Sequence, residues 1–167
     1  MSQDLNTIKN TPLVVVCSGV KSFLDVEKTV EALETFGVTF LGFKTDSFPL
    51  FYSSFSSTKL QHKATSVEDI VGVYKNNLEA GLLSSVLVLN PVPEKNQIPN
   101  NKINKIIDES IVDLSKNKII GKQATPFLLK RIARKTKNKS LEANISLAIN
   151  NIKLGARIAK ELNNLPH

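Results

Sequence analysis

The stretch Leu13-Val-Val-Val-Cys-Ser-Gly-Val-Lys21 decides the fold class of this chain. Residues 13–17 are apolar and mostly β-branched, which predicts a buried strand. Ser18 and Gly19 then break the apolar run. Lys21 therefore follows the carboxyl end of a strand, and that end is where open α/β sheets bind their ligands.

Strands and helices alternate outward from this stretch. The predicted elements are a strand over 13–17, a helix over 25–36, a strand over 38–43, a helix over 66–80, a strand over 85–89, and helices over 101–116, 125–135 and from 140 onward. This order predicts an α/β fold, a three-layer α/β/α arrangement with a partial, largely parallel sheet. Three strands are few, because open sheets usually have about four to six. We therefore expect the chain to form one part of a larger sheet.

Local signals predict where the helices start. Asp25 is an N-cap candidate, and Ser66-Val-Glu-Asp69 resembles a capping box with Asp in place of the usual Glu or Gln. Thr125-Pro126 predicts an N-cap followed by Pro at the first helical position, and Ser140 predicts the cap of the long last helix. Helical spacing puts the following apolar residues on one face of that last helix: Leu141, Ile145, Ala148, Ile152, Ala159 and Leu162.

The composition is that of an ordinary globular chain. Its 167 residues suit one domain, so we take residues 1–167 as a single, partial domain. Apolar residues make up 41% and charged residues 22%, which excludes wholesale disorder. The apolar runs are too short to span a bilayer, and the polar residues 1–10 lack the pattern of a secretory signal. We expect a cytoplasmic protein with no membrane partner.

Cysteine, histidine and net charge limit the possible chemistry. The single cysteine, Cys17, excludes a disulfide framework and a multi-cysteine zinc site, and it fits a reducing compartment. His62 and His167 are too few for a His-based metal site, so carboxylates, lysines, hydroxyls and amides must carry any reaction. The net charge of +7 comes mostly from solvated Lys-Asn runs. Without tryptophan, nucleic acid ranks below a phosphorylated small molecule as the anionic partner.

Two residues are candidates for binding or catalysis by position. Lys21 could bind phosphate as a point charge, or act as an amine nucleophile if its pKa is lowered. Position alone favours the alternative, a solvated loop lysine, because phosphate-binding lysines usually accompany a richer glycine loop. Asn144 lies beside the apolar stripe of the last helix, and Asn151 is seven residues further along the same face. A buried asparagine needs hydrogen-bond partners, so it either bonds a ligand or caps a neighbouring loop. Before any family is considered, we favour the loop-capping role.

Other polar groups near the strand ends have simpler explanations. Asp25 is explained by helix capping, and Asp46 remains an unassigned carboxylate. Cys17 is expected in the core, where nothing nearby would activate it as a thiolate.

Several motifs occur together and cover almost the whole chain. They are Val14-Val-Val-Cys-Ser-Gly-Val-Lys-Ser-Phe-Leu-Asp25, Leu33-Glu-Thr-Phe-Gly-Val38, Asn90-Pro-Val-Pro-Glu94, Gly121-Lys-Gln-Ala-Thr-Pro-Phe-Leu-Leu129 and Ser140-Leu-Glu-Ala-Asn-Ile145. In this order and spacing they resemble the signature of the pseudouridine-5′-phosphate glycosidases, the indigoidine-synthase-A-like family.

The resemblance implies a reaction and the residues that carry it. The family cleaves the C–C glycosidic bond of pseudouridine 5′-phosphate reversibly, giving uracil and ribose 5-phosphate. Lys21 stands where the family has its nucleophilic lysine, whose amine forms an imine with the sugar. Asn144 stands at an active-site asparagine of the family. Ser2, Gln3 and Asp4 match the end of the family's Asp-x-Ser-x-Asp-Leu motif, which implies substrate binding and, at Asp4, a divalent metal such as Mn²⁺.

The match begins inside that acidic motif, so the N-terminal half of the family fold has no counterpart here. In the family, that half carries the glutamate acid, the phosphate-binding lysine and the first Asp of the motif. We therefore expect metal binding to be weak or absent, since Asp4 would be a lone carboxylate ligand.

Three hypotheses follow about the activity of the chain. It is the C-terminal half of a working glycosidase that pairs with a separate N-terminal half or forms a homo-oligomer, or it is a non-catalytic truncated homologue or interaction subunit. A generic phosphosugar-binding domain is a weaker third. An N-terminal half encoded nearby would favour the first hypothesis.

Overall fold

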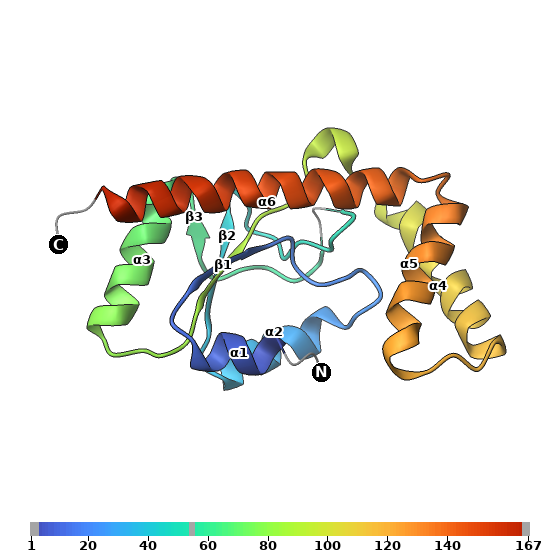
Figure 1. Cartoon of the computed structure of the whole chain (residues 1–167), viewed down its shortest axis with the longest axis horizontal. Helices are drawn as coiled ribbons and strands as arrows, with labels where there is room; N and C mark the ends of the chain where they lie inside the picture. Colours follow the sequence, from blue (N-terminus) through green and yellow to red (C-terminus); the bar gives the residue numbers. More distant parts are fainter. Residues whose placement is uncertain (1–3, 54–55, 165–167) are drawn as a thin grey trace.

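The described residues form one parallel sheet (Figure 1). The computed structural model describes residues 4–53 and 56–164. Its strands are β1 (Val14–Cys17), β2 (Thr39–Phe43), β3 (Lys63–Ala64) and β4 (Val86–Leu89). They lie in the order β1-β4-β2-β3, and each pair of neighbours is parallel. β1 is therefore an edge strand, and its hydrogen-bonded neighbour is β4.

Helices make up most of the remaining structure. They are α1 (Asp4–Asn10), α2 (Val26–Thr35), α3 (Val67–Glu79), α4 (Asn100–Lys116), α5 (Ala124–Lys135) and α6 (Lys139–Asn163), with short 3₁₀ turns η1 (Glu94–Asn96) and η2 (Gly121–Gln123). Within the described ranges, no helix has both the length and the apolar character needed to cross a membrane.

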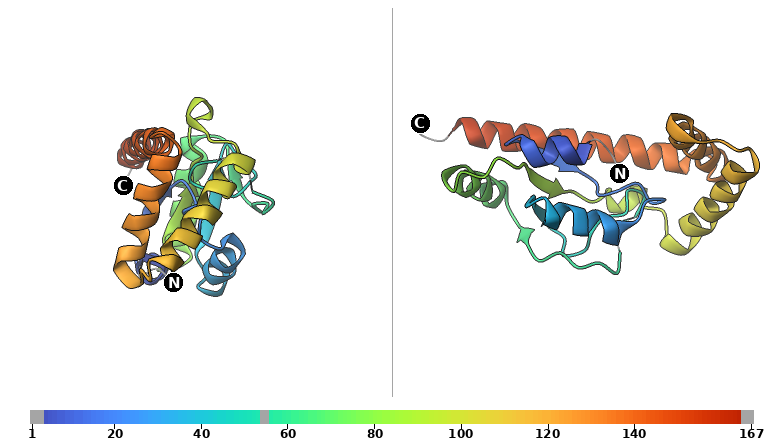
Figure 2. Two further views of the ribbon diagram at one scale, coloured as in Figure 1. Left: turned by 90° about the vertical axis from the view of Figure 1, so that its right-hand side faces the viewer. Right: turned by 90° about the horizontal axis from the view of Figure 1, so that it is seen from below.

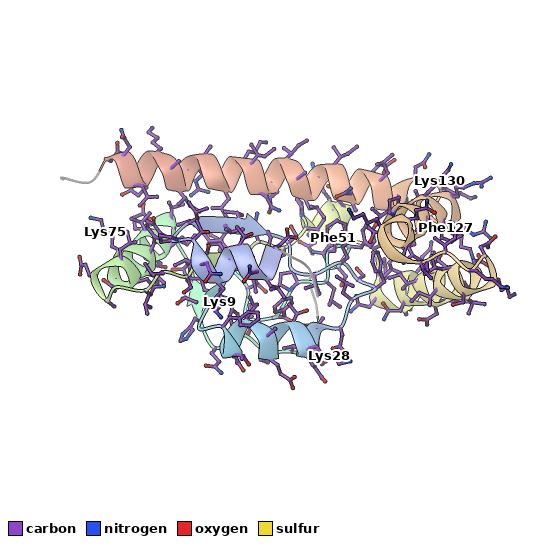
Figure 3. All side chains as sticks on the ribbon, turned by 60° about the horizontal axis from the view of Figure 1, so that its bottom comes forward. Lys9, Lys28, Phe51, Lys75, Phe127 and Lys130 are labelled. Carbon is purple, nitrogen blue, oxygen red and sulfur yellow. The ribbon has the colours of Figure 1, made fainter. Side chains whose placement is uncertain are left out.

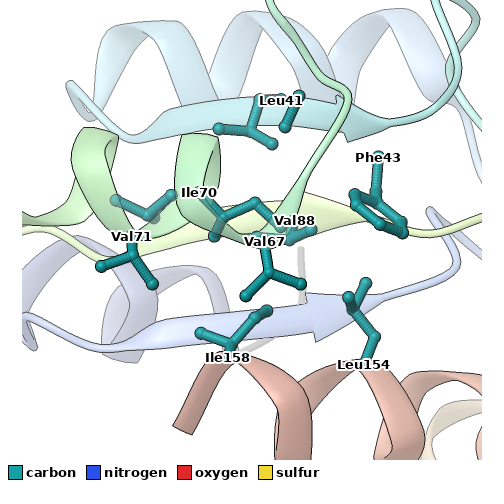
Figure 4. Close-up of a cluster of buried hydrophobic side chains, with 10 residues drawn as sticks. Leu41, Phe43, Val67, Ile70, Val71, Val88, Leu154 and Ile158 are labelled. Carbon is teal, nitrogen blue, oxygen red and sulfur yellow. The ribbon is translucent and has the colours of Figure 1, made fainter. Parts of the chain in front are cut away.

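Helices α3 and α6 cover one face of the sheet. Val86 and Val88 of β4 are fully buried on this face. They belong to a cluster with Ile70 of α3 and with Leu154 and Ile158 of α6 (Figure 4). The C-terminal part of α6 is thus one of the two helices that cover this face.

Helices α1 and α2 cover the opposite face. Leu87 and Leu89 of β4 are buried there together with Leu33 of α2. Because side chains alternate along a strand, a continuous apolar run fills both faces when helices cover the sheet on both sides. The arrangement is three-layered α/β/α with a parallel sheet, as the order of the elements predicts.

A helical lobe, formed by α4, α5 and the N-terminal part of α6, packs beside the sheet. Its buried cluster comprises Tyr52, Val92, Ile98, Ile103, Ile107, Leu128, Ile132, Ala143 and Leu147. Helix α6 runs along both the sheet and the lobe (Figure 2). One continuous helix therefore links the two clusters.

Two elements of the structure escape prediction. β3 has two residues and pairs only with Gly42 and Phe43 of β2, so it leaves no run of alternating residues in the sequence. Helix α1 is seven residues long, and none of its residues is buried. A helix this short has too few apolar residues to show a helical period in the sequence. With β3 included, the described sheet has four strands rather than the expected three.

The predicted helix starts are correct where the cap is local. The side chain of Asp25 accepts a hydrogen bond from the amide of Lys28 (3.1 Å). Ser66 and Asp69 form a complete capping box, in which each side chain bonds the backbone of the other residue. Both devices depend on residues three positions apart, which is why the sequence predicts them.

The predicted starts of α5 and α6 are wrong by one or two residues. Helix α5 begins at Ala124 after a 3₁₀ turn, so Thr125 and Pro126 fall inside its first turn, where proline is tolerated. The N-cap of α6 is Asn138, in the left-handed region with φ of 67°. Ser140 is buried one residue inside α6, with its hydroxyl 3.0 Å from that of Thr136.

Most of the apolar face expected on the last helix turns away from the core, although Leu162 at its C-terminal end packs against the cluster of α3 and α6. Leu141, Ile145 and Ile152 are 48%, 53% and 70% exposed. The buried residues of α6 are Ser140, Ala143, Leu147, Leu154 and Ile158. The helix is apolar on two sides, and periodicity alone cannot show which of the two is covered.

Candidate active site

The loop after β1 is held against the segment that follows β2. Gly19 forms an antiparallel bridge with Leu50. The amide of Phe51 donates to the carbonyl of Ser18 (3.1 Å), and the hydroxyl of Ser22 donates to the carbonyl of Leu50. Phe51 lies between the sheet and the helical lobe (Figure 3). The loop therefore has a defined path between the sheet and the helical lobe.

Gly19 makes this close approach possible. Its φ is +77°, and a Cβ at this position would lie 1.8 Å from the carbonyl oxygen of Pro49. Only glycine accepts both conditions. Lys21 follows two residues later in a half-buried position, and its carbonyl accepts from the amide of Leu24 (2.8 Å), which turns the chain toward α2.

A network of three polar side chains joins β1, β4 and α6 at this end of the sheet. Asn151 Oδ1 accepts from Asn90 Nδ2 (2.9 Å), and Asn151 Nδ2 donates to Ser18 Oγ (3.1 Å). Ser18 and Asn90 are 3% and 5% exposed. Buried amides and hydroxyls need such partners, so this Ser18–Asn90–Asn151 network holds α6 against the carboxyl ends of β1 and β4.

Asn144 faces the same region from further along α6. Two helical turns separate it from Asn151, so it lies roughly 10 Å along the axis and within about 20° of the same direction. Because Asn151 contacts Ser18, helical periodicity places half-buried Asn144 on the side of α6 that meets the carboxyl end of β1. In the described part of the chain, no hydrogen bond joins Asn144 to Lys21.

The ionisable groups nearest to Lys21 in the sequence are unsuited to proton donation. The backbone amide of Lys28 is the main cause that holds the pKa of Asp25 below its ordinary value, so Asp25 is a carboxylate at neutral pH. Burial raises the pKa of the Cys17 thiol to about 11. Cys17 is partly buried against the cluster under α2 and not fully in the core, and its raised pKa keeps it a thiol and not a thiolate. Asp46 is exposed and pairs with Lys59 (3.5 Å).

A surface pocket of about 470 Å³ opens beside the loop. It is lined by Asp25 and Glu27 at the start of α2, by residues 56–58 and by Asn104 of α4, among others. Hydroxyls, amides and carboxylates of this kind suit a hydroxyl-rich ligand such as a sugar. Lys21 is not among the lining residues, so the pocket does not contain the predicted nucleophile.

The acidic motif lies at the start of the described chain. Ser2 and Gln3 fall outside the described residues. Asp4 is the exposed first residue of α1. In the ranges 4–53 and 56–164, no three His, Cys, Asp or Glu side chains gather as a metal site would require. The described residues therefore do not fit a resident Mn²⁺ by themselves, because hard cations take several oxygen ligands.

Sequence reasoning placed Ser18 and Asn90 in two of the segments that follow predicted strands, residues 17–21 and 90–91, where a ligand could bind. It gave neither side chain a role of its own. Their position, directly after two strands that prove to be neighbours, is the signal that could have found them. The sequence placed Asn151 on the same helix face as Asn144. In the structure, Asn151 has defined hydrogen-bond partners in Ser18 and Asn90.

Comparisons with known proteins identify the family of this sequence. The sequence profile of the family described as "Indigoidine synthase A like protein" matches residues 1–161. A protein of Brachyspira hyodysenteriae named pseudouridine-5′-phosphate glycosidase is 42% identical over 99% of this chain and 54% of its own length. One of Legionella pneumophila with the same name is 44% identical over 95% of this chain and 51% of its own length.

Solved structures show the same fold. An indigoidine synthase A-like protein from Thermotoga maritima superposes with a TM-score of 0.86 at 39% identity, covering 97% of this chain and 53% of its own. A prealnumycin C-glycosynthase, solved in complex with ribulose 5-phosphate, superposes with a TM-score of 0.88 over 96% of this chain and 53% of its own. At 24% identity, the second likeness concerns the fold alone.

These results define an α/β protein with a candidate lysine site at the carboxyl edge of a parallel sheet. The chain belongs to the indigoidine synthase A-like family. It spans about half the length of the curated relatives it matches.

Proposed function

We propose that this chain supplies the nucleophile-bearing half of a C-glycosidase site that converts pseudouridine 5′-phosphate and water reversibly into uracil and ribose 5-phosphate. One observation carries the proposal: Lys21 follows the carboxyl end of β1 in a chain 42% identical to a relative named for this activity. The Ser18–Asn90–Asn151 network supports it, because a site needs neighbours that are themselves held in place.

The chemistry explains why a lysine would serve here. A carbon-linked base takes the bonding electrons when it leaves, so C1′ must be stabilised as an electron-deficient centre, and the lone pair of an attached nitrogen can do this. Lys21 Nζ adds to C1′ while the C1′–O4′ bond breaks and the ring oxygen takes a proton. A general acid then protonates C5 of the base, the C1′–C5 bond breaks with its electrons going to uracil, and the nitrogen lone pair forms the imine. Water adds to C1′, the C–N bond breaks, and ribose 5-phosphate leaves the free amine.

The general acid is not among the groups just described. Asp25 is held ionised by its cap, and the Cys17 thiol, with a pKa of about 11, is too weak an acid. The resemblance places the acid and the phosphate-binding lysine in the N-terminal half of the family, to which this chain has no matching residues. We propose that turnover requires that half, either within a longer polypeptide or as a second chain.

The remaining site residues have supporting roles in this proposal. Asn144 would hydrogen-bond the bound sugar or base, and Ser2, Gln3 and Asp4 would contribute to substrate binding. Mn²⁺ would need oxygen ligands beyond Asp4, so no step is assigned to it.

Reductive trapping tests the role of Lys21. The chain is mixed with the N-terminal half of the B. hyodysenteriae relative, incubated with ribose 5-phosphate, reduced with borohydride and mapped by mass spectrometry. We expect the sugar on Lys21 and none after Lys21→Arg. Lys28→Arg is the matched control, because this exposed lysine follows the same loop and points outward (Figure 3). Full uracil release by Lys21→Ala in the same mixture would contradict the assignment.

A non-catalytic interaction subunit is the second candidate. The exposed apolar residues of α6 favour it, since such residues mark contact surfaces. A chain that binds its partner half but gives neither trapping nor uracil release would support this alternative.

A further inference from the structure

Apolar residues follow the outer face of α6. Leu141, Ile145, Ile149 and Ile152 are 48%, 53%, 48% and 70% exposed. Their spacing keeps them on one side of the helix for about three turns. Their exposure is unusual, because an apolar stripe of this length normally faces a core. We call these four residues the α6 outer stripe.

The backbone of β1 has an open edge beside this helix. The amides of Val86 and Asn90 donate to the carbonyls of Leu13 and Cys17 (2.8 and 2.7 Å). In a parallel pair, only alternate residues of an edge strand bond the neighbouring strand. The backbone groups of Val14 and Val16 therefore point away from β4. In the described part of the chain, they have no hydrogen-bond partner.

A groove connects the open edge to α6. It has a volume of about 200 Å³, and its lining includes Leu13 and Val16 of the edge, Tyr74 of α3, and Gly155 and Ala159 of α6. Leu13 is 50% exposed. Small side chains on the helix leave room for another backbone to approach β1.

We propose that the open edge of β1, the groove and the α6 outer stripe together bind the polypeptide equivalent to the N-terminal half of the relatives, which adds a strand beside β1 and covers the stripe. The length of that half is the reason for choosing it, since the relatives extend to almost twice the part matched here. A second copy fits less well, because a two-fold axis at this edge would pair β1 antiparallel with itself in an otherwise parallel sheet. The proposal is independent of any catalytic role of Lys21.

Thiol labelling tests the surface without an activity assay. Cysteines are introduced singly as Ile152→Cys and Ile145→Cys on the stripe and as Ile120→Cys between α4 and α5. Ile120 is 83% exposed and lies outside the surface, which makes it the matched control. The full chain is labelled alone, with the separately produced N-terminal half of the B. hyodysenteriae relative, and as a single-chain fusion to that half. Labelled sites are located by mass spectrometry.

We expect the labelling of positions 152 and 145 to slow at least about tenfold in the mixture or the fusion, because a covered thiol reacts only when the contact opens. Labelling of position 120 should be unchanged. Amide exchange at Val14 and Val16 should slow in parallel. Unchanged rates on the stripe in the fusion would overturn the proposal, as would equal slowing at position 120. Protection that appears in the chain alone and grows with its concentration would instead assign the surface to a second copy.

Discussion

At the scale of single residues, we expect Asn151 of α6 to have a structural role and Asn144 of the same helix to have a binding role. Asn151→Ala would leave buried Ser18 and Asn90 without their shared partner. We expect it to lower the free energy of unfolding by about 1–3 kcal/mol. Asn144→Ala should stay within about 0.5 kcal/mol of the natural chain, yet reduce trapping at Lys21 when the partner half is present. Urea unfolding and trapping yield measure the two effects, and equal destabilisation by both variants would contradict the division.

Gly19 is the residue on which the path of the lysine loop depends. Gly19→Ala would place a methyl group against the Pro49 carbonyl at a positive φ. We expect a loss of several kcal/mol, well above the roughly 1 kcal/mol of an unhindered positive-φ glycine. Gly81→Ala is the control, because its φ is +73° and nothing lies within 4 Å of its Cβ position. Similar melting temperatures for the two variants would show that the loop can move aside.

At the scale of elements, two close ion pairs and a longer one from Lys135 to Asp113 (3.7 Å) tie α4 to α5 in the lobe. Arg131 Nε lies 2.7 Å from Asp113, and Lys135 Nζ lies 2.7 Å from Glu109. These cations lower the pKa values of the two acids from 3.8 and 4.5. A lowered pKa means that the stabilisation is present above the ordinary value and is lost as the pH falls below it.

We therefore expect the melting temperature to decline in acid, with part of that decline absent in Asp113→Asn. Asp108→Asn, an exposed change on the same helix, should leave the acid profile unaltered. Melting curves recorded between about pH 3 and 7 make the comparison. An Asp113→Asn profile parallel to that of the natural chain would show that the pair contributes nothing.

At the scale of the whole molecule, we expect the chain alone to release no measurable uracil and to self-associate. Losing a positioned general acid typically costs about a hundredfold to ten-thousandfold in rate. An open strand edge and an apolar stripe favour association. A uracil-release assay with light scattering checks both, and Ile152→Lys should reduce the association while Ile120→Lys does not. Robust turnover by a monodisperse monomer would refute this prediction.

Residues 13–17 were expected to form a buried strand, but β1 is an edge strand whose residues are only partly buried. The amino-acid sequence by itself determined the positions of β1, β2 and β4, the α2 and α3 caps and the position of Lys21 after β1. Each depends on residues a few positions apart, through apolar runs or through side chains that bond nearby amides. The N-cap of α6 at Asn138 was not predicted in this way, because the turn from α5 depends on the left-handed conformation of Asn138 and on the buried Thr136–Ser140 contact.

Only the tertiary structure decided the order β1-β4-β2-β3, the partners of Asn151 and the side of α6 that is covered. The two ends of the Asn151–Ser18 bond lie 133 residues apart in the sequence, and no local pattern encodes such a pairing. Either apolar face of α6 could be buried in a core, and only its packing against the sheet decides which one is. Burial depends on which surfaces meet in three dimensions. For this reason the exposure of the α6 outer stripe, and the partner contact proposed for it, could be found only from the fold and not from the periodicity of the sequence.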